Sequence, residues 1–443
     1  MSGFYNMKHT VYKETIEIPV MGNFDVIVVG GGPAGIASAL AASRHGMHVL
    51  VVESYGFLGG MWTMGMVVPF FDQENKGGIC YEIVGALNAL NMIKVAGPDM
   101  WAFDIEQMKL LLDRMLLKED ITLLFHTHFT TPIIENGKIM GIVVENKNGR
   151  SAYNARIVID CTGDGDVAAR AGVPFEIGRP EDGSTQPMTL MFQMSNVAYV
   201  QDYYKYHHYV DNELIQKLQD AMVRAGVMNY QFNYLRPCII PVPGIYTSIC
   251  QATHIRNLSA INSEDLTQAE LQGREEVNKL FHLFKTYMPE FTHAHIDTSG
   301  PHIGIRESRR IMGEYKLTID DIEQSRQFDD GICTVTFWVD IHQPDGDNQS
   351  KQYGKLLQPH YQIPYRCLVP LNVENLLIAG RCISGSFEAH ASYRVTGNCV
   401  AMGYAAGVAA SICIKSNISP RTTDGCEVVT IMTADGAVCR AQR

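Results

Sequence analysis

A glycine-rich segment, Gly30-Gly31-Gly32-Pro33-Ala34-Gly35, has the residue types and spacing of a phosphate-binding turn. Its glycines match G-x-G-x-x-G: the first allows a tight turn, the second lets the backbone approach a pyrophosphate, and the third allows close packing of a helix on a strand. A helix that begins near Pro33 would present its positive end to the phosphates. The segment therefore predicts dinucleotide binding by Gly30, Gly32, Pro33, Ala34 and Gly35.

The acidic residue Glu53 lies 23 residues after Gly30, near the spacing expected for a carboxylate that binds a ribose. Ser54 follows it, and the pair Gly59-Gly60 marks a second place where a backbone must pass close to another group. No Lys-Ser or Lys-Thr follows the first glycines, which excludes a P-loop. Glycine turns also occur without a ligand, but a position after a strand and before a helix favours the dinucleotide.

Two other clusters have residue types that bind metals. Asp164 and Asp166 lie on a glycine-rich loop at a strand end, where we expect their side chains to cap backbone N–H groups. His293, His295 and His302 have no carboxylate at ligand spacing, so we expect satisfied or solvent-facing histidines. The eleven cysteines include no C-x-x-C pair, the usual ligand spacing of zinc ribbons and iron-sulfur clusters. We therefore predict no metal site.

The elements around the glycine-rich segment form a βαβ unit. Residues 24–29 predict a strand buried on both faces of a parallel sheet, residues 36–45 a helix, and residues 48–53 a second strand. Asp104, with Gln107 three residues later, predicts the start of another helix. Between residues 121 and 159, the hairpin signals Asn136-Gly137 and Asn148-Gly149 predict a three-stranded β-meander, which leads into a further core strand at residues 156–160.

The middle of the chain differs in character from both ends. Residues 173–365 are rich in Tyr, His, Arg and Met and contain alternating runs at 244–252 and 332–341, which predicts an inserted α+β domain. Residues 376–380 return to the pattern of a core strand ending in glycine. We expect a nucleotide-binding domain made of residues 21–172 and 366–443, a substrate domain at residues 173–365, and a lead at residues 1–20.

Composition narrows the class of protein. The 443 residues are 46% hydrophobic and 19% charged, as in ordinary globular proteins, and the net charge of −11 disfavours nucleic acid and anionic membranes as partners.

Residues 1–21 lack the apolar region of a secretory signal and the cysteines fit reduced thiols, so we expect a cytoplasmic location. Residues 397–414 carry no formal charge, but Asn398 and many small residues predict a buried helix and no membrane span.

The sequence resembles the FAD-dependent oxidoreductases of the glutathione-reductase-like fold, and within them a bacterial family known simply as FAD-dependent oxidoreductase. The resemblance spans nearly the whole chain. It rests on Phe24-Asp25-Val26-Ile27-Val28-Val29, Leu58-Gly59-Gly60, Asp160-Cys161-Thr162-Gly163-Asp164-Gly165-Asp166, Gly304-Ile305-Arg306-Glu307-Ser308-Arg309-Arg310 and Asn375-Leu376-Leu377-Ile378-Ala379-Gly380-Arg381. It implies an α/β fold, with a Rossmann-like FAD-binding domain of parallel sheet and meander and an inserted α+β substrate domain.

The resemblance also implies FAD contacts along the chain. The first glycines would hold the pyrophosphate, Glu53 the adenosine ribose, and the last helix would aim its positive end at the flavin. In place of the usual Gly-Asp the sequence has Gly380-Arg381, so we expect Arg381 to pair with the pyrophosphate or to be a surface or interdomain arginine. The other expected contacts are Ser54, Gly59, Gly60, Met61, Phe129, Gly163, Asp164, Gly380, Gly397 and Asn398. No His or Cys lies in the glycine clusters, so the FAD is expected to be non-covalent.

The implied reaction is flavin-mediated hydride transfer on a small organic substrate, with an electron acceptor that no motif identifies; a homo-oligomer is compatible with the sequence. Candidates for catalysis are Arg306 as a clamp for an anion or carbonyl, His342 and His390 as acid or base, and Arg394 as an orienting group. These residues could instead anchor one domain on the other. No second G-x-G-x-x-G supports a nicotinamide site and no cysteine pair a disulfide reductase. The alternative function is a binding module in which FAD is structural or sensory.

Overall fold

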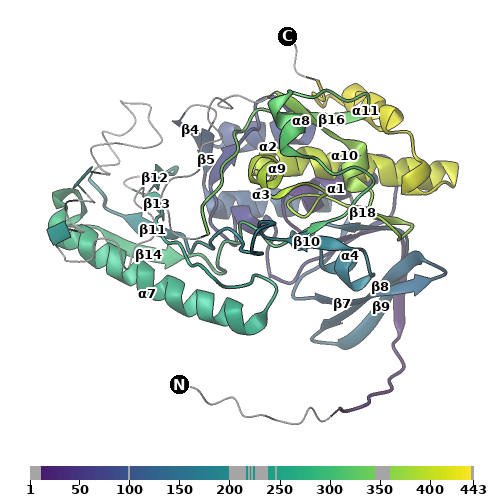
Figure 1. The fold of residues 1–443 in the computed structure, drawn as a ribbon, viewed down its shortest axis with the longest axis horizontal. Helices are drawn as coiled ribbons and strands as arrows, with labels where there is room; N and C mark the ends of the chain where they lie inside the picture. Colours follow the sequence, from purple (N-terminus) through teal and green to yellow (C-terminus); the bar gives the residue numbers. More distant parts are fainter. Residues whose placement is uncertain are drawn as a thin grey trace.

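The computed structural model describes residues 11–97, 100–198, 216–217, 220, 223–224, 238–244, 247–344 and 360–440. In Figure 1 the helices α1 and α10 occupy the centre, the strands β7, β8 and β9 project at the lower right, and the long helix α7 runs along the lower left. The predicted α/β class is confirmed.

A seven-stranded sheet forms the centre of the fold. Its parallel part has the order β6-β2-β1-β9, with β18 paired to β9. The strands are β1 (Val20–Val29), β2 (Val49–Val52), β6 (Thr122–Leu124), β9 (Gly149–Asp160) and β18 (Leu376–Ile378). Helix α1 (Pro33–Arg44) joins β1 to β2, which confirms the βαβ unit. The continuous runs of Val, Ile and Leu form strands here because both faces of a parallel sheet are buried.

The predicted meander is present, but its last strand is longer than expected. β7 (His128–Glu135), β8 (Lys138–Asn146) and β9 pair antiparallel, and Asn136 and Gly137 both have positive φ, as a type I′ hairpin turn requires. The first half of β9 pairs with β8 and its second half with β18. The separate core strand expected at residues 156–160 is therefore a continuation of the meander.

Helix α10 (Thr396–Ser416) is long and apolar enough to cross a membrane, yet its residues 396–414 are buried in the core, as predicted. It is followed by one more helix, so it is not the last helix that the sequence suggested. Small residues allow it to pack closely on α1. A Cβ at Gly403 or Gly407 would collide with the backbone of Ala34 or Ser38, and Ser38 Oγ donates a 3.0 Å hydrogen bond to Gly403 O.

A second hydrophobic core lies beside the first. Its members fall between residues 188 and 305 and pack between helix α7 (Ser263–Tyr287) and a sheet of order β12-β13-β11-β14, at the left of Figure 1. The strands are β11 (Phe192–Ser195), β12 (Cys238–Pro241), β13 (Ser248–Gln251) and β14 (His295–Ser299). Buried residues from Ile311 to Tyr365 pack with the first core. The boundaries at 172 and 365 remain predictions.

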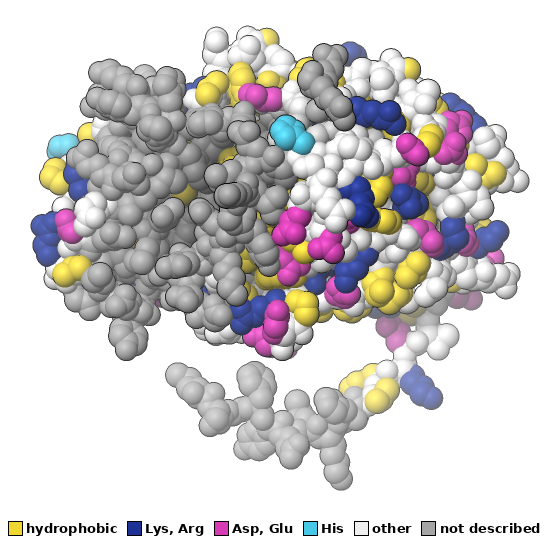
Figure 2. Space-filling view, turned by 45° about the horizontal axis from the view of Figure 1, so that its top comes forward, with side chains coloured by type: hydrophobic (Ala, Val, Ile, Leu, Met, Phe, Trp, Pro, Cys, Tyr) yellow, Lys and Arg dark blue, Asp and Glu magenta, His cyan; other side chains and the backbone are white. Residues whose placement is uncertain are grey.

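Shorter elements complete the described structure. Asp104 caps α3 by accepting the N–H of Gln107 at 2.8 Å, as predicted. The remaining helices are α2 (Gly78–Ala89), α3 (Ile105–Lys118), α4 (Asp166–Arg170), α8 (Ile319–Glu323), α9 (Phe387–Tyr393) and α11 (Gly425–Ala434). The remaining strands are β3 (Pro69–Phe71), β4 (Ile93–Gly97), β5 (Met100–Phe103), β10 (Phe175–Ile177), β15 (Arg309–Ile311), β16 (Gly331–Val335) and β17 (Tyr361–Pro364). Figure 2 shows acidic and basic side chains intermixed over the described part of one face.

Candidate functional site

A cavity of about 460 Å³ opens where the central strands end. Its wall contains the glycine turn after β1, Glu53 after β2, residues 161–164 after β9 and residues 379–381 after β18. Residues from the middle of the chain, including Thr189 and Arg306, also line this cavity. The carboxyl ends of parallel strands are the usual place for a ligand in such sheets.

The glycine turn leaves backbone groups facing this cavity. Gly30 has φ +101°, and a Cβ at Gly35 would collide with the carbonyl oxygen of Gly30. A Cβ at Gly32 would meet nothing closer than the Cα of Gly60, 3.8 Å away. No side chain caps the first turn of α1, which begins at Pro33. The N–H groups of this turn are therefore placed to bind an anionic group in the cavity.

Glu53 is 7% exposed and holds the turn from the neighbouring strand. Its Oε2 accepts the Gly31 N–H at 2.7 Å, and its Oε1 accepts the Tyr55 N–H at 2.9 Å and the Ser54 hydroxyl at 3.1 Å. A carboxylate has about four lone-pair positions, so these bonds leave capacity for a ribose hydroxyl. Sequence reasoning found the position of Glu53 but missed its bond to the turn.

The loop after β9 corrects one prediction. Asp164 and Asp166 do not cap backbone N–H groups: Asp164 pairs with Arg381 at 2.7 Å, and Asp166 with Arg309 at 2.8 Å. Asp160 does the capping, accepting the N–H groups of residues 162 and 168. Burial raises the pKa of Asp160 to about 6, which its hydrogen bonds partly oppose.

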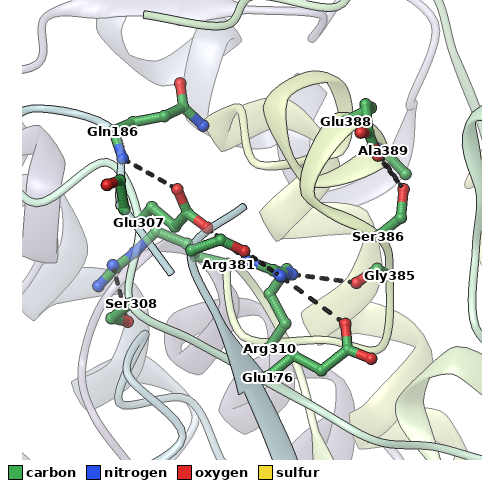
Figure 3. Close-up of polar contacts among 12 residues, drawn as sticks. Glu176, Gln186, Glu307, Ser308, Arg310, Arg381, Gly385, Ser386, Glu388 and Ala389 are labelled. Carbon is green, nitrogen blue, oxygen red and sulfur yellow. Dashed lines mark hydrogen bonds and ion pairs between the residues drawn. The ribbon is translucent and has the colours of Figure 1, made fainter. Parts of the chain in front are cut away.

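Arg381 also donates to Ser308 Oγ at 3.2 Å (Figure 3). Its guanidinium therefore joins the end of β18 to Asp164 and to the segment after Arg306. This supports the interpretation of Arg381 as an anchor between segments, and its contact with a pyrophosphate stays a prediction.

The beginning of α10 contributes polar groups at the far side of the cavity. Thr396 lines the cavity, and neither its hydroxyl nor the amide of the fully buried Asn398 has a hydrogen-bond partner among the described residues. The N-cap, Val395, supplies no capping side chain. A polar ligand near this helix end would satisfy groups that the fold itself leaves unpaired. Phe129, Gly163, Gly380 and Met61 also line the cavity, as expected.

A partly buried charged cluster forms another part of the cavity wall. His342 Nε2 lies 3.1 Å from Asp340 Oδ2, and Arg394 Nη2 lies 3.2 Å from the same oxygen. His342 Nδ1 lies 3.1 Å from His254 Nε2. Arg306 Nη1 donates to Pro187 O at 2.8 Å and to the Thr189 hydroxyl. The structure thus brings together three of the four residues predicted for catalysis.

The cluster shifts the titration of its members. Burial and the charge of Arg306 lower the pKa of His342 to about 4, although Asp340 opposes this. Burial tends to raise the pKa of Asp340, but His342, Arg394 and Arg306 together hold it well below its usual range. Near neutral pH the pair is therefore an ionised carboxylate beside a neutral imidazole. His342 then donates through Nε2 to Asp340, and His254 donates through Nε2 to His342 Nδ1.

The fourth predicted residue, His390, does not reach this site. It is fully buried on α9 and packs edge-on against Tyr393, outside the cavity wall. Burial and nearby arginines lower its pKa, and neither ring nitrogen has a hydrogen-bond partner among the described residues.

Glu307 and Arg310, which follow Arg306, form a buried ion pair that supports the cluster (Figure 3). Glu307 accepts the Gln186 N–H at 3.0 Å, and Gln186 Oε1 in turn accepts the His342 N–H at 3.1 Å. Arg310 Nε donates to Gly385 O at 3.2 Å. These residues position His342 without lining the cavity.

Sequence reasoning missed Asp340, Trp338 and His254. Residues 338–342 alternate in burial: Trp338, Asp340 and His342 line the cavity, whereas Val339 and Ile341 are buried in the core. The alternating run at residues 332–341 was the available signal for the first two. For His254 the sequence carries no motif.

Comparison with known proteins gives one family model over most of the chain and several partial relatives. A family model described as FAD dependent oxidoreductase matches residues 25–432. Thiamine thiazole synthase of Methanococcus aeolicus is 28% identical over 165 residues, covering 35% of this chain and 60% of that protein. Digeranylgeranylglycerophospholipid reductase of Sulfolobus acidocaldarius is 29% identical over 177 residues, covering 36% of this chain and 38% of that protein. The chain thus spans less than two thirds of the length of these curated relatives.

Among solved structures, p-nitrophenol 4-monooxygenase from Pseudomonas putida aligns with 94% of this chain and 89% of its own, with a TM-score of 0.50 and 11% sequence identity. At that identity the likeness shows the fold alone.

Proposed function

The chain belongs to the family of FAD-dependent oxidoreductases, and we propose that it transfers a hydride between a small organic substrate and a non-covalently bound FAD. The observation that carries this proposal is the continuity of one cavity. Its wall includes both the glycine turn of a dinucleotide site and the charged cluster of Arg306, Asp340, His342 and Arg394.

The residues at the glycine end fit an extended dinucleotide. The uncapped first turn of α1 and the open face of Gly32 would hold the pyrophosphate, and Glu53 would hold the ribose beside it. Phe129 would contact the adenine. Thr396, which lines the cavity and whose hydroxyl has no hydrogen-bond partner among the described residues, would help to hold the flavin end of the cofactor. FAD supplies the redox chemistry when bound.

The protein's part is to orient the substrate and to move its proton. Arg306, fixed by Pro187 and Thr189, would hold an anionic or carbonyl group of the substrate. His342 and Arg394 both bind Oδ2 of Asp340, which leaves Oδ1 to accept a hydrogen bond from the substrate. The Asp340–His342 pair would take up the proton when the substrate is oxidised and return it when the substrate is reduced.

The experiment that tests this function starts from the purified, FAD-loaded protein. Acid denaturation should release FAD into the supernatant, and the bound flavin should bleach with dithionite and recover in air. Anaerobic bleaching is then measured against alcohols, hydroxy acids, amines and sugars. A flavin that neither reduces nor reoxidises would overturn the redox proposal and favour the alternative, a structural or sensory FAD.

A further inference from the structure

The second half of the cavity combines an aromatic wall with an arginine at one end. We propose that the substrate is a small monocarboxylate with a flat apolar body, whose carboxylate binds Arg306 and whose body lies against Phe71, Phe337 and Trp338. This inference rests on the proposed function and names the substrate class of that same site.

The aromatic wall consists of three rings from two distant segments. Phe337 and Trp338 stack with centroids 4.2 Å apart, and Phe71 lies 5.1 Å from Phe337 and 6.2 Å from Trp338. All three line the cavity, and Trp338 is 40% exposed. A ring contact of this kind favours a flat, apolar or aromatic partner.

Buried polar contacts fix the wall in place. Asp72, next to Phe71, accepts the Thr336 N–H at 3.1 Å and the Thr336 hydroxyl at 2.6 Å. Lys76 pairs with Asp72 at 3.1 Å and donates to Thr334 O at 2.6 Å, and both charged residues are buried. The two segments that carry the rings are therefore joined directly behind the wall. Such support is typical of a preorganised binding surface.

The charged end of the same cavity favours one negative charge. Arg306 and Arg394 contribute two guanidinium groups, Asp340 contributes one carboxylate, and His342 is neutral near neutral pH. These four residues carry a net charge of +1, which a monoanion would balance. Arg306 is 8% exposed, so its attraction for a carboxylate is weakly screened by water. A cationic substrate would face net repulsion here.

The aromatic wall and the charged residues are adjacent in the chain as well as in the cavity. Trp338 and Asp340 lie on the same side of one extended segment, and Arg394 binds Asp340 from α9's C-terminal end. A ligand that touches the rings therefore lies beside the charged cluster. This juxtaposition assigns the apolar body and the anionic group to one molecule.

The test measures binding to the FAD-loaded protein by calorimetry and by the visible difference spectrum of the flavin. Phenylacetate is the probe; phenylacetamide lacks its charge and acetate lacks its ring. We expect phenylacetate to bind about ten- to a hundredfold more tightly than phenylacetamide, the range for a charge-assisted hydrogen bond, and also more tightly than acetate.

Two variants separate the contributions. Arg306→Ala should remove the preference for phenylacetate over phenylacetamide, and Trp338→Leu should reduce the preference for phenylacetate over acetate. Trp101→Leu is the matched control, because Trp101 lies outside the cavity wall and bonds to Glu74. It should leave all three affinities unchanged.

Equal affinity for phenylacetate and phenylacetamide, equal affinity for phenylacetate and acetate, or no binding of phenylacetate would each overturn the substrate class. Reversible bleaching of the flavin in the same preparation would show that the redox function survives such a failure. A flavin that does not bleach would instead contradict the proposed function.

Discussion

The backbone N–H of Gly31 donates a 2.7 Å hydrogen bond to the carboxylate of Glu53, so the end of β2 holds the glycine turn that follows β1. The two residues lie 22 positions apart in the chain. Any loss of this carboxylate would therefore disturb the turn as well as a ribose contact. Loss of the ribose contact would lower only the affinity for FAD, whereas loss of the hydrogen bond to the turn would also destabilise the protein without FAD.

We expect Glu53→Ala to lower FAD affinity by about ten- to a hundredfold, as for the loss of a charge-assisted hydrogen bond. Because the Gly31 N–H loses its partner, the FAD-free protein should also melt at a lower temperature than FAD-free wild type. Equilibrium titration with FAD and thermal unfolding without FAD measure the two effects. Full occupancy at nanomolar FAD would count against a role for Glu53 in binding.

Gly32 and Gly35 should respond differently to the same substitution. Gly32→Ala places its Cβ in open cavity space, so the variant should fold with a normal melting temperature without FAD and yet bind FAD weakly. Gly35→Ala should destabilise the fold itself, because its Cβ would collide with the carbonyl oxygen of Gly30. Thermal unfolding and FAD content of both variants decide this. Normal FAD binding by Gly32→Ala would show that this face does not contact the cofactor.

The dinucleotide half of the site could be predicted from sequence because its signals are local. The glycine spacing, the acidic strand end at Glu53 and the Asn-Gly turns each specify a conformation within a few residues. The catalytic half depends on contacts between distant segments. His254 and His342 are 88 residues apart, and only the folded chain shows that their rings meet.

The errors have the same origin. Asp164 and Asp166 pair with Arg381 and Arg309 rather than with backbone groups, because the fold brings those arginines to the loop. A histidine's sequence position likewise does not reveal which side of a short helix faces the cavity. His390 was expected, with His342, to act as an acid or base, but its side chain lies in the core.

Substitution of His390 tests that placement. His390→Phe should leave the rate of flavin reduction within about twofold and should leave stability unchanged or raise it by about 1 kcal/mol, because a buried polar ring without partners carries a desolvation cost. Thermal unfolding and anaerobic flavin reduction are the measurements. Strongly slowed reduction at normal stability and FAD content would return His390 to the list of catalytic candidates.

Arg306 should affect substrate and not FAD. We expect Arg306→Ala to retain FAD and its visible spectrum, while reduction by substrate slows by about a hundredfold, a typical loss of about 3 kcal/mol for an orienting contact made in the transition state. Arg306→Lys should recover little of the rate, because a point charge lacks the bidentate fork. Anaerobic reduction is compared with FAD content measured in parallel. Loss of FAD and folding together would make Arg306 a structural anchor instead.

The pH dependence of reduction should report His342. Since the pKa of His342 is lowered to about 4, the imidazole stays neutral through the physiological range, and the rate should fall on the acid side near pH 4 rather than near the ordinary histidine value of about 6.5. Arg306 disfavours the imidazolium, so Arg306→Gln should move this limb to higher pH. Asp340 favours the imidazolium, so Asp340→Asn should move it to lower pH. Burial is the largest cause of the shift and remains in both variants, so neither limb should reach 6.5.

The two variants should shift the pH profile in opposite directions, which a general loss of activity would not do. The comparison therefore tests the charged cluster itself. Each profile is normalised to its own maximum, with the panel compound that bleaches the flavin fastest as reductant and FAD content checked at every pH. If the rate of the wild-type protein fell on the acid side near pH 6.5, the pKa of His342 would not be lowered by its surroundings. Shifts of the same sign in Arg306→Gln and Asp340→Asn would show that the titrating group lies outside the electrostatic reach of these two residues, and His342 would then be removed from proton transfer.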